Sequence, residues 1–193
     1  MNKIVSGIIV ILGIFTQEVY SATNNSSIIE CAWNQFTNQV PDKDWMDYFT
    51  LSESLNFDLY LRRPSYQTFA CTISNNWQDA LSSFLSIGTN ETKRLAVLGV
   101  GKSFDDNFYI AYCNALADLQ QRGFITTQEL RWSLASSFTN LDTCLIRRYQ
   151  EPQVTNLVVK LKEIFPNNSQ WEDVLSGASY TNYLEEVEAG LWD

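Results

Sequence analysis

The stretch DDNFYIAYCNALADLQQRG, residues 105–123, decides the fold class of this chain. Asp105 and Asp106 stand where a first helical turn favours acidic side chains, and Gly123 suits the position just past a helix end. Between them the apolar residues recur with helical period and form one face, made of Phe108, Tyr112, Ala115, Leu116 and Leu119. The stretch therefore predicts a long amphipathic helix whose apolar face packs against other helices.

The same helical period continues on both sides of this stretch. Thr126 and Glu129 form a capping box that opens a helix carrying Leu130, Leu134, Phe138 and Leu141. Few segments alternate with period two, so strands are scarce. We expect further helices over 28–36, 41–49 (extending toward 61), 66–73, 77–87, 91–100, 154–165 and 181–190, with caps at Asn90 and Ser169. The sequence predicts an all-α bundle of up-down antiparallel helices with an N-terminal helical extension.

The first 21 residues are typical of a secretory signal peptide. Lys3 provides the positive start, Ile8 to Phe15 form a short apolar run, and Val19 and Ser21 are small enough for a cleavage site. The apolar run is shorter than the roughly 20 residues of a membrane span. We expect export to the cell exterior or to a bacterial periplasm, and one helical domain over residues 22–193.

The charge balance limits the classes of partner. The chain has 13 Lys and Arg against 22 Asp and Glu, a formal net charge of −9. An acidic surface disfavours nucleic acids and anionic membranes and suits a basic protein partner. Four glycosylation sequons begin at Asn24, Asn25, Asn90 and Asn167, and they do not indicate the host.

The absence of histidine disfavours most catalytic mechanisms. The chain contains none, which removes Ser-His-Asp triads, Cys-His dyads and histidine zinc ligands. Residues 96–103, AVLGVGKS, resemble a phosphate loop, but Ala96 replaces its first glycine and a helix is expected before it. The acidic groups 105–106 and 185–188 are interpreted as solvated helix surface. We therefore predict no catalytic residue, no metal and no cofactor, and a protein-binding role by elimination.

The positions of the arginine doublets and the tryptophans on the expected helices predict which of them are at the surface and which are in the core. Arg62-Arg63 and Arg147-Arg148 are expected to be surface ion-pair partners. Core positions are expected for Trp33, Trp77 and Trp132. Trp171 and Trp192 lie near helix ends, where exposed tryptophans often act as interface anchors.

The stretch WSLASSFTNLDTC, residues 132–144, carries the one resemblance to a known family. Its matching positions are Trp132, Ala135, Thr139, Asn140, Asp142, Thr143 and Cys144, with weaker echoes at 90–95 and 112–119. The stretch resembles a conserved block of the plant invertase and pectin methylesterase inhibitors. The resemblance implies a four-helix bundle that inhibits a cell-wall carbohydrate enzyme by occlusion, without a cofactor. It also implies that Thr139, Asn140 and Asp142 lie in or beside the contact.

Four cysteines in an oxidising compartment favour two disulfides, with three connectivities open. We expect Cys31–Cys71 and Cys113–Cys144. A regular hairpin would separate the second pair by about 10 Å along the helix axes, so this bond requires an asymmetric loop or a broken helix. The family also spaces its first two cysteines much more closely than Cys31 and Cys71.

Three alternatives to the plant-type inhibitor remain open from the sequence. A bacterial periplasmic immunity-type protein that blocks a toxin would have the same signal peptide and acidic surface. A carrier would hold a small apolar ligand between its helices. An enzyme that works with two carboxylates is the least favoured of the three.

Overall fold

The structure is a computed structural model of the chain, and it describes residues 28–40, 49–50, 62–135, 138–168 and 170–191. Every regular element in these residues is helical, and the described part contains no strand. A first helix covers residues 28–39. The later elements are α3 (Pro64–Ser74), α4 (Trp77–Ser82), η3 (Phe84–Ile87), α5 (Glu91–Leu98), η4 (Gly99–Ser103), α6 (Asp106–Gln121), α7 (Thr127–Ala135), α8 (Phe138–Arg147), α9 (Pro152–Ile164), α10 (Gln170–Ser176) and α11 (Ala178–Glu188). The prediction of an all-α helical bundle is confirmed.

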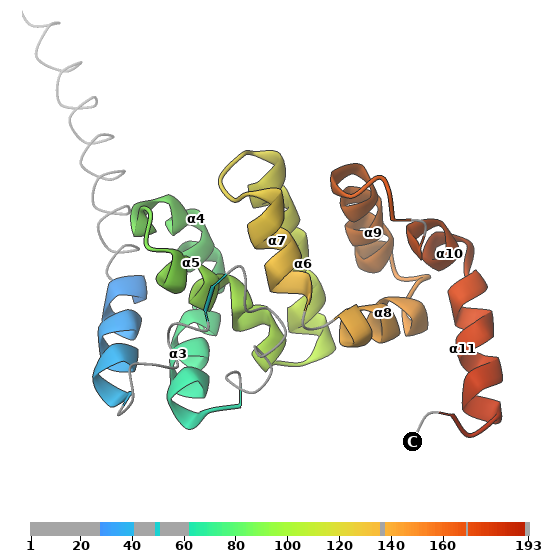
Figure 1. The fold of residues 1–193 in the computed structure, drawn as a ribbon, viewed down its shortest axis with the longest axis horizontal. Coiled ribbons are helices and arrows are strands. Elements are labelled where there is room, and N and C mark those ends of the chain that lie inside the picture. The colour runs from blue at the N-terminus through green and yellow to red at the C-terminus, as the bar shows by residue number, and fades with distance from the viewer. Residues whose placement is uncertain (1–27, 41–48, 51–61, 136–137, 169, 192–193) are drawn as a thin grey trace, which may run out of the picture.

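The helices lie side by side in an elongated row (Figure 1). The helix over 28–39 stands at one end and α11 at the other. In the middle, α6 and α7 form an antiparallel hairpin, and α9 packs along α6. α8 runs across the row and leads into the C-terminal helices. Packing is therefore mostly between neighbours in the row.

Side-chain caps define where α5 and α6 begin. Asp105 Oδ1 accepts hydrogen bonds from the backbone N–H groups of Asn107 at 2.9 Å and Phe108 at 3.1 Å. Asn90 Oδ1 accepts one from the Lys93 N–H at 2.9 Å. Both side chains satisfy donors that have no partner within the first helical turn. The predicted starts of these two helices are confirmed.

The capping box at the start of α7 is also confirmed, and it extends into the neighbouring helix. The Thr126 N–H donates to Glu129 Oε2 at 2.8 Å, and the Glu129 N–H donates to Thr126 Oγ1 at 3.0 Å. Arg94 of α5 donates from Nε to Glu129 Oε1 at 2.6 Å. One buried carboxylate, 6% exposed, thus caps α7 and joins it to α5.

Aromatic rings fill the core of the N-terminal half. Phe36 and Phe69 have ring centroids 5.1 Å apart, and Phe49 stacks on Tyr66 at 5.5 Å. Tyr66 is fully buried, and its hydroxyl donates to the Ala96 carbonyl oxygen at 2.8 Å. The bond satisfies a polar group that would otherwise be costly to bury, and it joins α3 to α5.

The phosphate-loop resemblance at residues 96–103 corresponds to the junction of α5 and η4, with no strand in the described residues before it. A Cβ on Gly101 would lie 2.8 Å from Tyr112 Cδ1. Tyr112 is fully buried and donates from its hydroxyl to the Val97 carbonyl oxygen at 2.6 Å. Gly101 therefore lets η4 approach the side chain of Tyr112, which is a packing role.

Two predicted helices are interrupted. The helix expected to continue from Leu134 through Leu141 is divided, because α7 ends at Ala135 and α8 begins at Phe138. The region 77–87 forms α4 and the short η3 rather than one helix. The helix expected over 41–49, its extension to 61 and the Ser169 cap lie mostly or wholly outside the described residues. Among the helices that are described, none combines the length and apolar composition that a bilayer span needs.

Candidate binding surfaces

The block at 132–144 lies partly on α7 and partly on α8. Trp132 is 2% exposed and Cys144 is 1% exposed, so two of its matching residues are packing residues. Thr139, Asn140 and Asp142 fall in the first half of α8, and their side chains lie outside the described part of the structure. α8 packs against α11. The three predicted contact residues are therefore on a helix adjacent to the C-terminal helix.

The predicted disulfides are absent from the structure. All four cysteines are free, and no two of them lie at disulfide distance. Cys31 and Cys71 are exposed, since each occupies the outer side of a helix whose neighbouring apolar residues face the core. Cys113 and Cys144 are both buried in the core on α6 and α8 but are not bonded. The expectation of Cys31–Cys71 and Cys113–Cys144 bonds is therefore wrong for this structure.

The buried thiols are in an environment that keeps them protonated. Burial raises the pKa of Cys113 to about 12. Burial and the nearby Asp106 carboxylate raise the pKa of Cys144 to about 11. Because the thiolate is the reactive form, neither side chain is activated as a nucleophile.

The charged groups that suggested chemistry are paired as structural groups. Asp105 caps α6, and Arg147 Nη2 lies 3.4 Å from Asp106 Oδ2. Arg148 Nη2 lies 2.7 Å from Glu151 Oε2, so the second arginine doublet forms ion pairs, as predicted. The described residues contain no group of three or more cysteine or acidic side chains placed to hold a metal ion.

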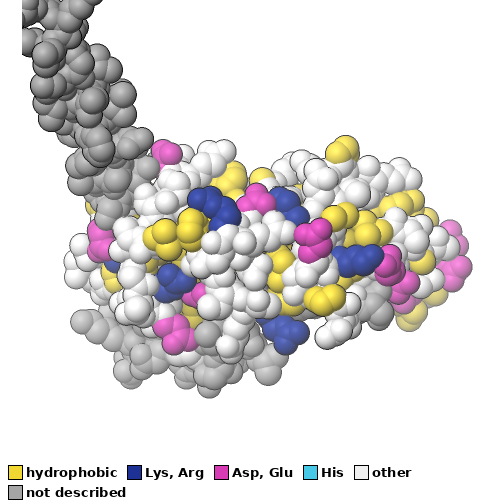
Figure 2. All heavy atoms as spheres, turned by 90° about the horizontal axis from the view of Figure 1, so that it is seen from above, with side chains coloured by type: hydrophobic (Ala, Val, Ile, Leu, Met, Phe, Trp, Pro, Cys, Tyr) yellow, Lys and Arg dark blue, Asp and Glu magenta, His cyan; other side chains and the backbone are white. Residues whose placement is uncertain are grey.

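The C-terminal helix presents an uncovered apolar face. α11 has no buried residue, although it packs against α10 and α8. Leu184 is 42% exposed, Val187 40% and Leu191 72%. Leu184 and Val187, three residues apart, share one side of α11, and Leu191 follows shortly after the helix end at Glu188. We call these three exposed residues the α11 apolar face. Figure 2 shows acidic side chains gathered beside hydrophobic ones at this end of the molecule.

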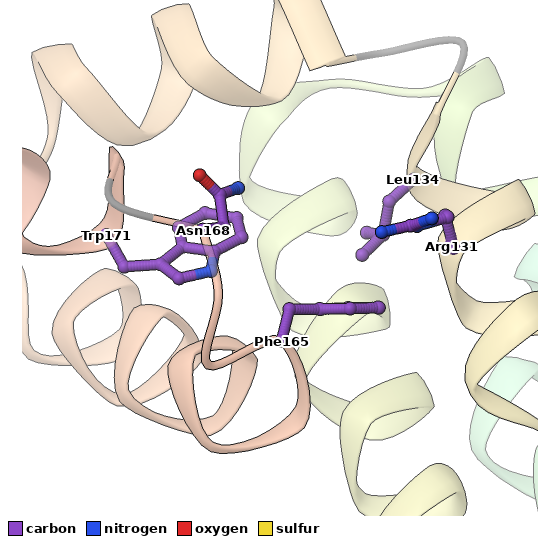
Figure 3. Close-up of a pocket in the computed structure, with 5 residues that line it drawn as sticks. All are labelled: Arg131, Leu134, Phe165, Asn168 and Trp171. Carbon is purple, nitrogen blue, oxygen red and sulfur yellow. The ribbon is translucent and has the colours of Figure 1, made fainter.

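A small hollow lies where α7, α10 and the segment after α9 meet. Its volume is about 30 Å³. Arg131 and Leu134 enter it from α7, and Phe165 and Asn168 from the segment after α9 (Figure 3). Trp171 of α10 forms the opposite wall. We call this site the α7–α10 hollow.

Trp171 corrects the expectation of an exposed anchor near a helix end. The side chain is 1% exposed, and its Nε1–H has no hydrogen-bond partner. Helical period alone places Trp171 at the start of α10, but its burial depends on the approach of α7 and the residues after α9. Trp132 is buried and Trp33 and Trp77 are partly buried against the core, as predicted. Trp192 lies outside the described residues.

A second depression, the α4–α6 groove, is wider and more open. Its volume is about 260 Å³, and its apolar lining includes Leu81, Ala115 and Leu119. Asp118 and Arg122 also line it. Typical small-molecule pockets have volumes of roughly 300–1,000 Å³ and enclose most of the ligand. The groove therefore does not favour the carrier hypothesis.

Neither the α11 apolar face nor the hollow was identified as a site from the sequence. The apolar spacing of Leu184, Val187 and Leu191 is visible in the sequence, but only the structure shows that no described helix covers these residues.

Comparisons of the chain with protein-family models, with curated proteins and with solved structures find no match in any of the three.

Proposed function

We propose that the chain is an exported, non-enzymatic module that binds a protein partner through the α11 apolar face. The observation that carries the proposal is the exposure of Leu184 and Val187 on a helix with no buried residue, together with the exposure of Leu191 just past its end. An amphipathic helix with an uncovered stripe is a recurrent means of docking into an apolar groove on another protein. Export is inferred from the signal-peptide pattern of residues 1–21.

The charges around the stripe indicate the chemistry of the partner. Glu185 and Glu188 are exposed beside the α11 apolar face. The chain as a whole has a net charge of −9. The complementary surface is an apolar groove with a basic rim, because opposite charges steer the encounter and fix its orientation. Such steering weakens as salt screens the charges.

Within this proposal, the partner is an enzyme that the module inhibits. The support is the block at 132–144, which resembles the plant invertase and pectin methylesterase inhibitors, together with the contact between α8 and α11. Thr139, Asn140 and Asp142 belong to α8, the helix that packs against α11.

The double variant Leu184→Ser, Val187→Ser should weaken specific capture of the partner. The wild-type chain and the double variant are immobilised and exposed to the secreted proteins of the host. Removing two adjacent apolar anchors should weaken binding at least about tenfold, because such anchors contribute most of an interface's affinity. The association rate of the captured protein with the wild-type chain should also fall as ionic strength rises from roughly 0.05 to 0.5 M.

Leu85→Ser is the matched control, since Leu85 is 57% exposed but stands on η3, outside the stripe. Equal capture by the wild-type chain, the control and the double variant would refute the role of the α11 apolar face. A salt-insensitive association rate would refute the electrostatic part of the proposal.

The inhibitor hypothesis predicts saturable inhibition of an invertase or a pectin methylesterase at mildly acidic pH. Asp142→Ala should weaken that inhibition by about tenfold, whereas Asp173→Ala, the same change on α10, should leave it unaltered. Steady-state activity of each enzyme is measured against increasing concentrations of the chain. Full activity of both enzymes at micromolar excess would exclude this family of targets and leave the docking proposal to its own test.

A further inference from the structure

We propose that the α7–α10 hollow is a binding site for a carboxylate group. Its lining brings three hydrogen-bond donors together and contains no acidic side chain: Arg131, Asn168 and Trp171 are its polar members. A site lined by donors is complementary to an acceptor with negative charge. This site is separate from the α11 apolar face and does not depend on the proposed function.

Trp171 is the first part of the argument. Its indole is 1% exposed, yet the Nε1–H has no hydrogen-bond partner. Buried polar groups in folded proteins nearly always have a partner, because an unpaired donor loses its water without compensation. In Figure 3 the nitrogen lies on the edge of the ring turned toward Phe165, where it borders the hollow.

Arg131 supplies the charge. Its guanidinium carbon lies 5.7 Å from the centroid of the Phe165 ring, and the side chain makes no ion pair or hydrogen bond in the described structure. By contrast, Arg147 and Arg148 both pair with carboxylates. A guanidinium held against an aromatic face keeps its donors available, and its planar fork suits the two oxygens of a carboxylate.

Asn168 completes the set of donors. Its Oδ1 already accepts a hydrogen bond from the Gln170 N–H at 3.1 Å. The amide nitrogen is then the polar atom that Asn168 can offer to the hollow, beside the Trp171 ring (Figure 3). The nearest acidic residue along the chain from Trp171, Glu172, is paired with Lys162 and does not line the hollow.

The size of the hollow separates a carboxylate from larger anions. A volume of about 30 Å³ accommodates roughly two water-sized groups, since one such group needs about 10–15 Å³. Two carboxylate oxygens fit this space, whereas the four oxygens of a phosphate or sulfate exceed it. Leu134 and Phe165 form an apolar wall, which suits an aliphatic or aromatic stem behind the carboxylate.

The carboxylate can come from a free monocarboxylic acid or from an acidic side chain of a protein. The ¹⁵N-labelled chain is titrated with sodium propionate and, separately, with a blocked Gly-Glu-Gly peptide, at constant ionic strength. The readout is the indole N–H resonance of Trp171. It is assigned by its loss in Trp171→Phe or, if that variant does not fold, by cross-peaks to the Phe165 ring.

We expect a saturable downfield shift of this resonance. Arg131→Gln should raise the apparent dissociation constant about tenfold or more, because it removes the charge-assisted bond. Arg122→Gln should change it less than about twofold. Arg122 is the matched control because it also stacks on a phenylalanine, with its guanidinium carbon 4.3 Å from the Phe124 centroid, but borders the α4–α6 groove.

A lower apparent dissociation constant for the glutamate peptide assigns the carboxylate to a protein partner. A lower one for propionate assigns it to a free acid. No shift up to about 100 mM of either ligand, a range that covers millimolar dissociation constants, would show that the hollow holds water alone. An equal shift with chloride or sulfate, or a shift insensitive to Arg131→Gln, would also overturn the proposal.

Discussion

Glu129→Ala should lower the free energy of unfolding by about 3–5 kcal/mol, as expected when one partner of a buried ion pair is removed. The carboxylate accepts hydrogen bonds from Arg94 Nε and from the Thr126 N–H and Oγ1. Its loss leaves the Arg94 guanidinium, whose side chain is only 15% exposed, without its counterion and removes the acceptor of the Thr126 N–H in the capping box of α7. Chemical denaturation of the variant and the wild-type chain measures the difference.

The same carboxylate should make stability depend on pH in the acidic range. Burial opposes its ionisation, but hydrogen bonds from Arg94 and Thr126 outweigh burial and hold the pKa of Glu129 below its ordinary value. A lowered folded-state pKa stabilises the fold fully above the unfolded-state value, and this contribution is lost as the pH falls through the folded-state pKa. The difference between wild type and Glu129→Ala should therefore shrink below about pH 4.5.

Glu172→Ala is the control for a general effect of removing acidic charge. Glu172 pairs with Lys162, but both side chains are largely exposed. Exposed ion pairs contribute about 0–1 kcal/mol, so the control should unfold close to the wild type. Similar losses in the two variants would show that Glu129 has no special structural role.

Gly177→Ala should destabilise the C-terminal end of the fold by about 2–4 kcal/mol, from two separate causes. Gly177 has φ +79°, a left-handed conformation that alanine adopts at a cost. An added Cβ would also lie 2.8 Å from Tyr149 Cε2. Tyr149 packs against Tyr180 of α11, with ring centroids 5.4 Å apart, so the clash should displace α11 as well.

Gly190→Ala separates the two causes. Gly190 has φ +73°, but a Cβ there would meet nothing within 4 Å. It should therefore show only the conformational cost, roughly 1–2 kcal/mol. Hydrogen exchange of the α11 amides, compared among the two variants and the wild type, locates the change. Equal protection of α11 in both variants would contradict the clash with Tyr149.

The elements that could be predicted from the sequence are those with local causes. The cap at Asn90 and the capping box at Thr126 and Glu129 involve residues within three positions of each other, so their hydrogen bonds follow from spacing. The helix over residues 105–123 could likewise be predicted from the helical period of its apolar residues alone. These signals predicted the start and end of α6 to within one residue.

The features that could not be predicted depend on contacts between distant segments. Trp171 was expected near the surface because the sequence shows only that it lies near a helix end. Its burial involves α7, which lies some 40 residues earlier in the chain. The disulfides were predicted from an even number of cysteines in an oxidising compartment, but a disulfide also requires two sulfur atoms at bonding distance. Arg131 had no local signal at all, because the ring that it contacts, Phe165, belongs to a distant segment of the chain.

The elongated row of helices has a consequence for how this protein can diverge. In a row, each helix is stabilised mainly by contacts with its neighbours, so a substitution at one end has little effect on packing at the other. α11 contributes no buried residue, whereas the Phe36 and Tyr66 cluster belongs to the opposite end of the row. Substitutions in the terminal helix can thus accumulate while the aromatic cluster at the other end keeps the same fold.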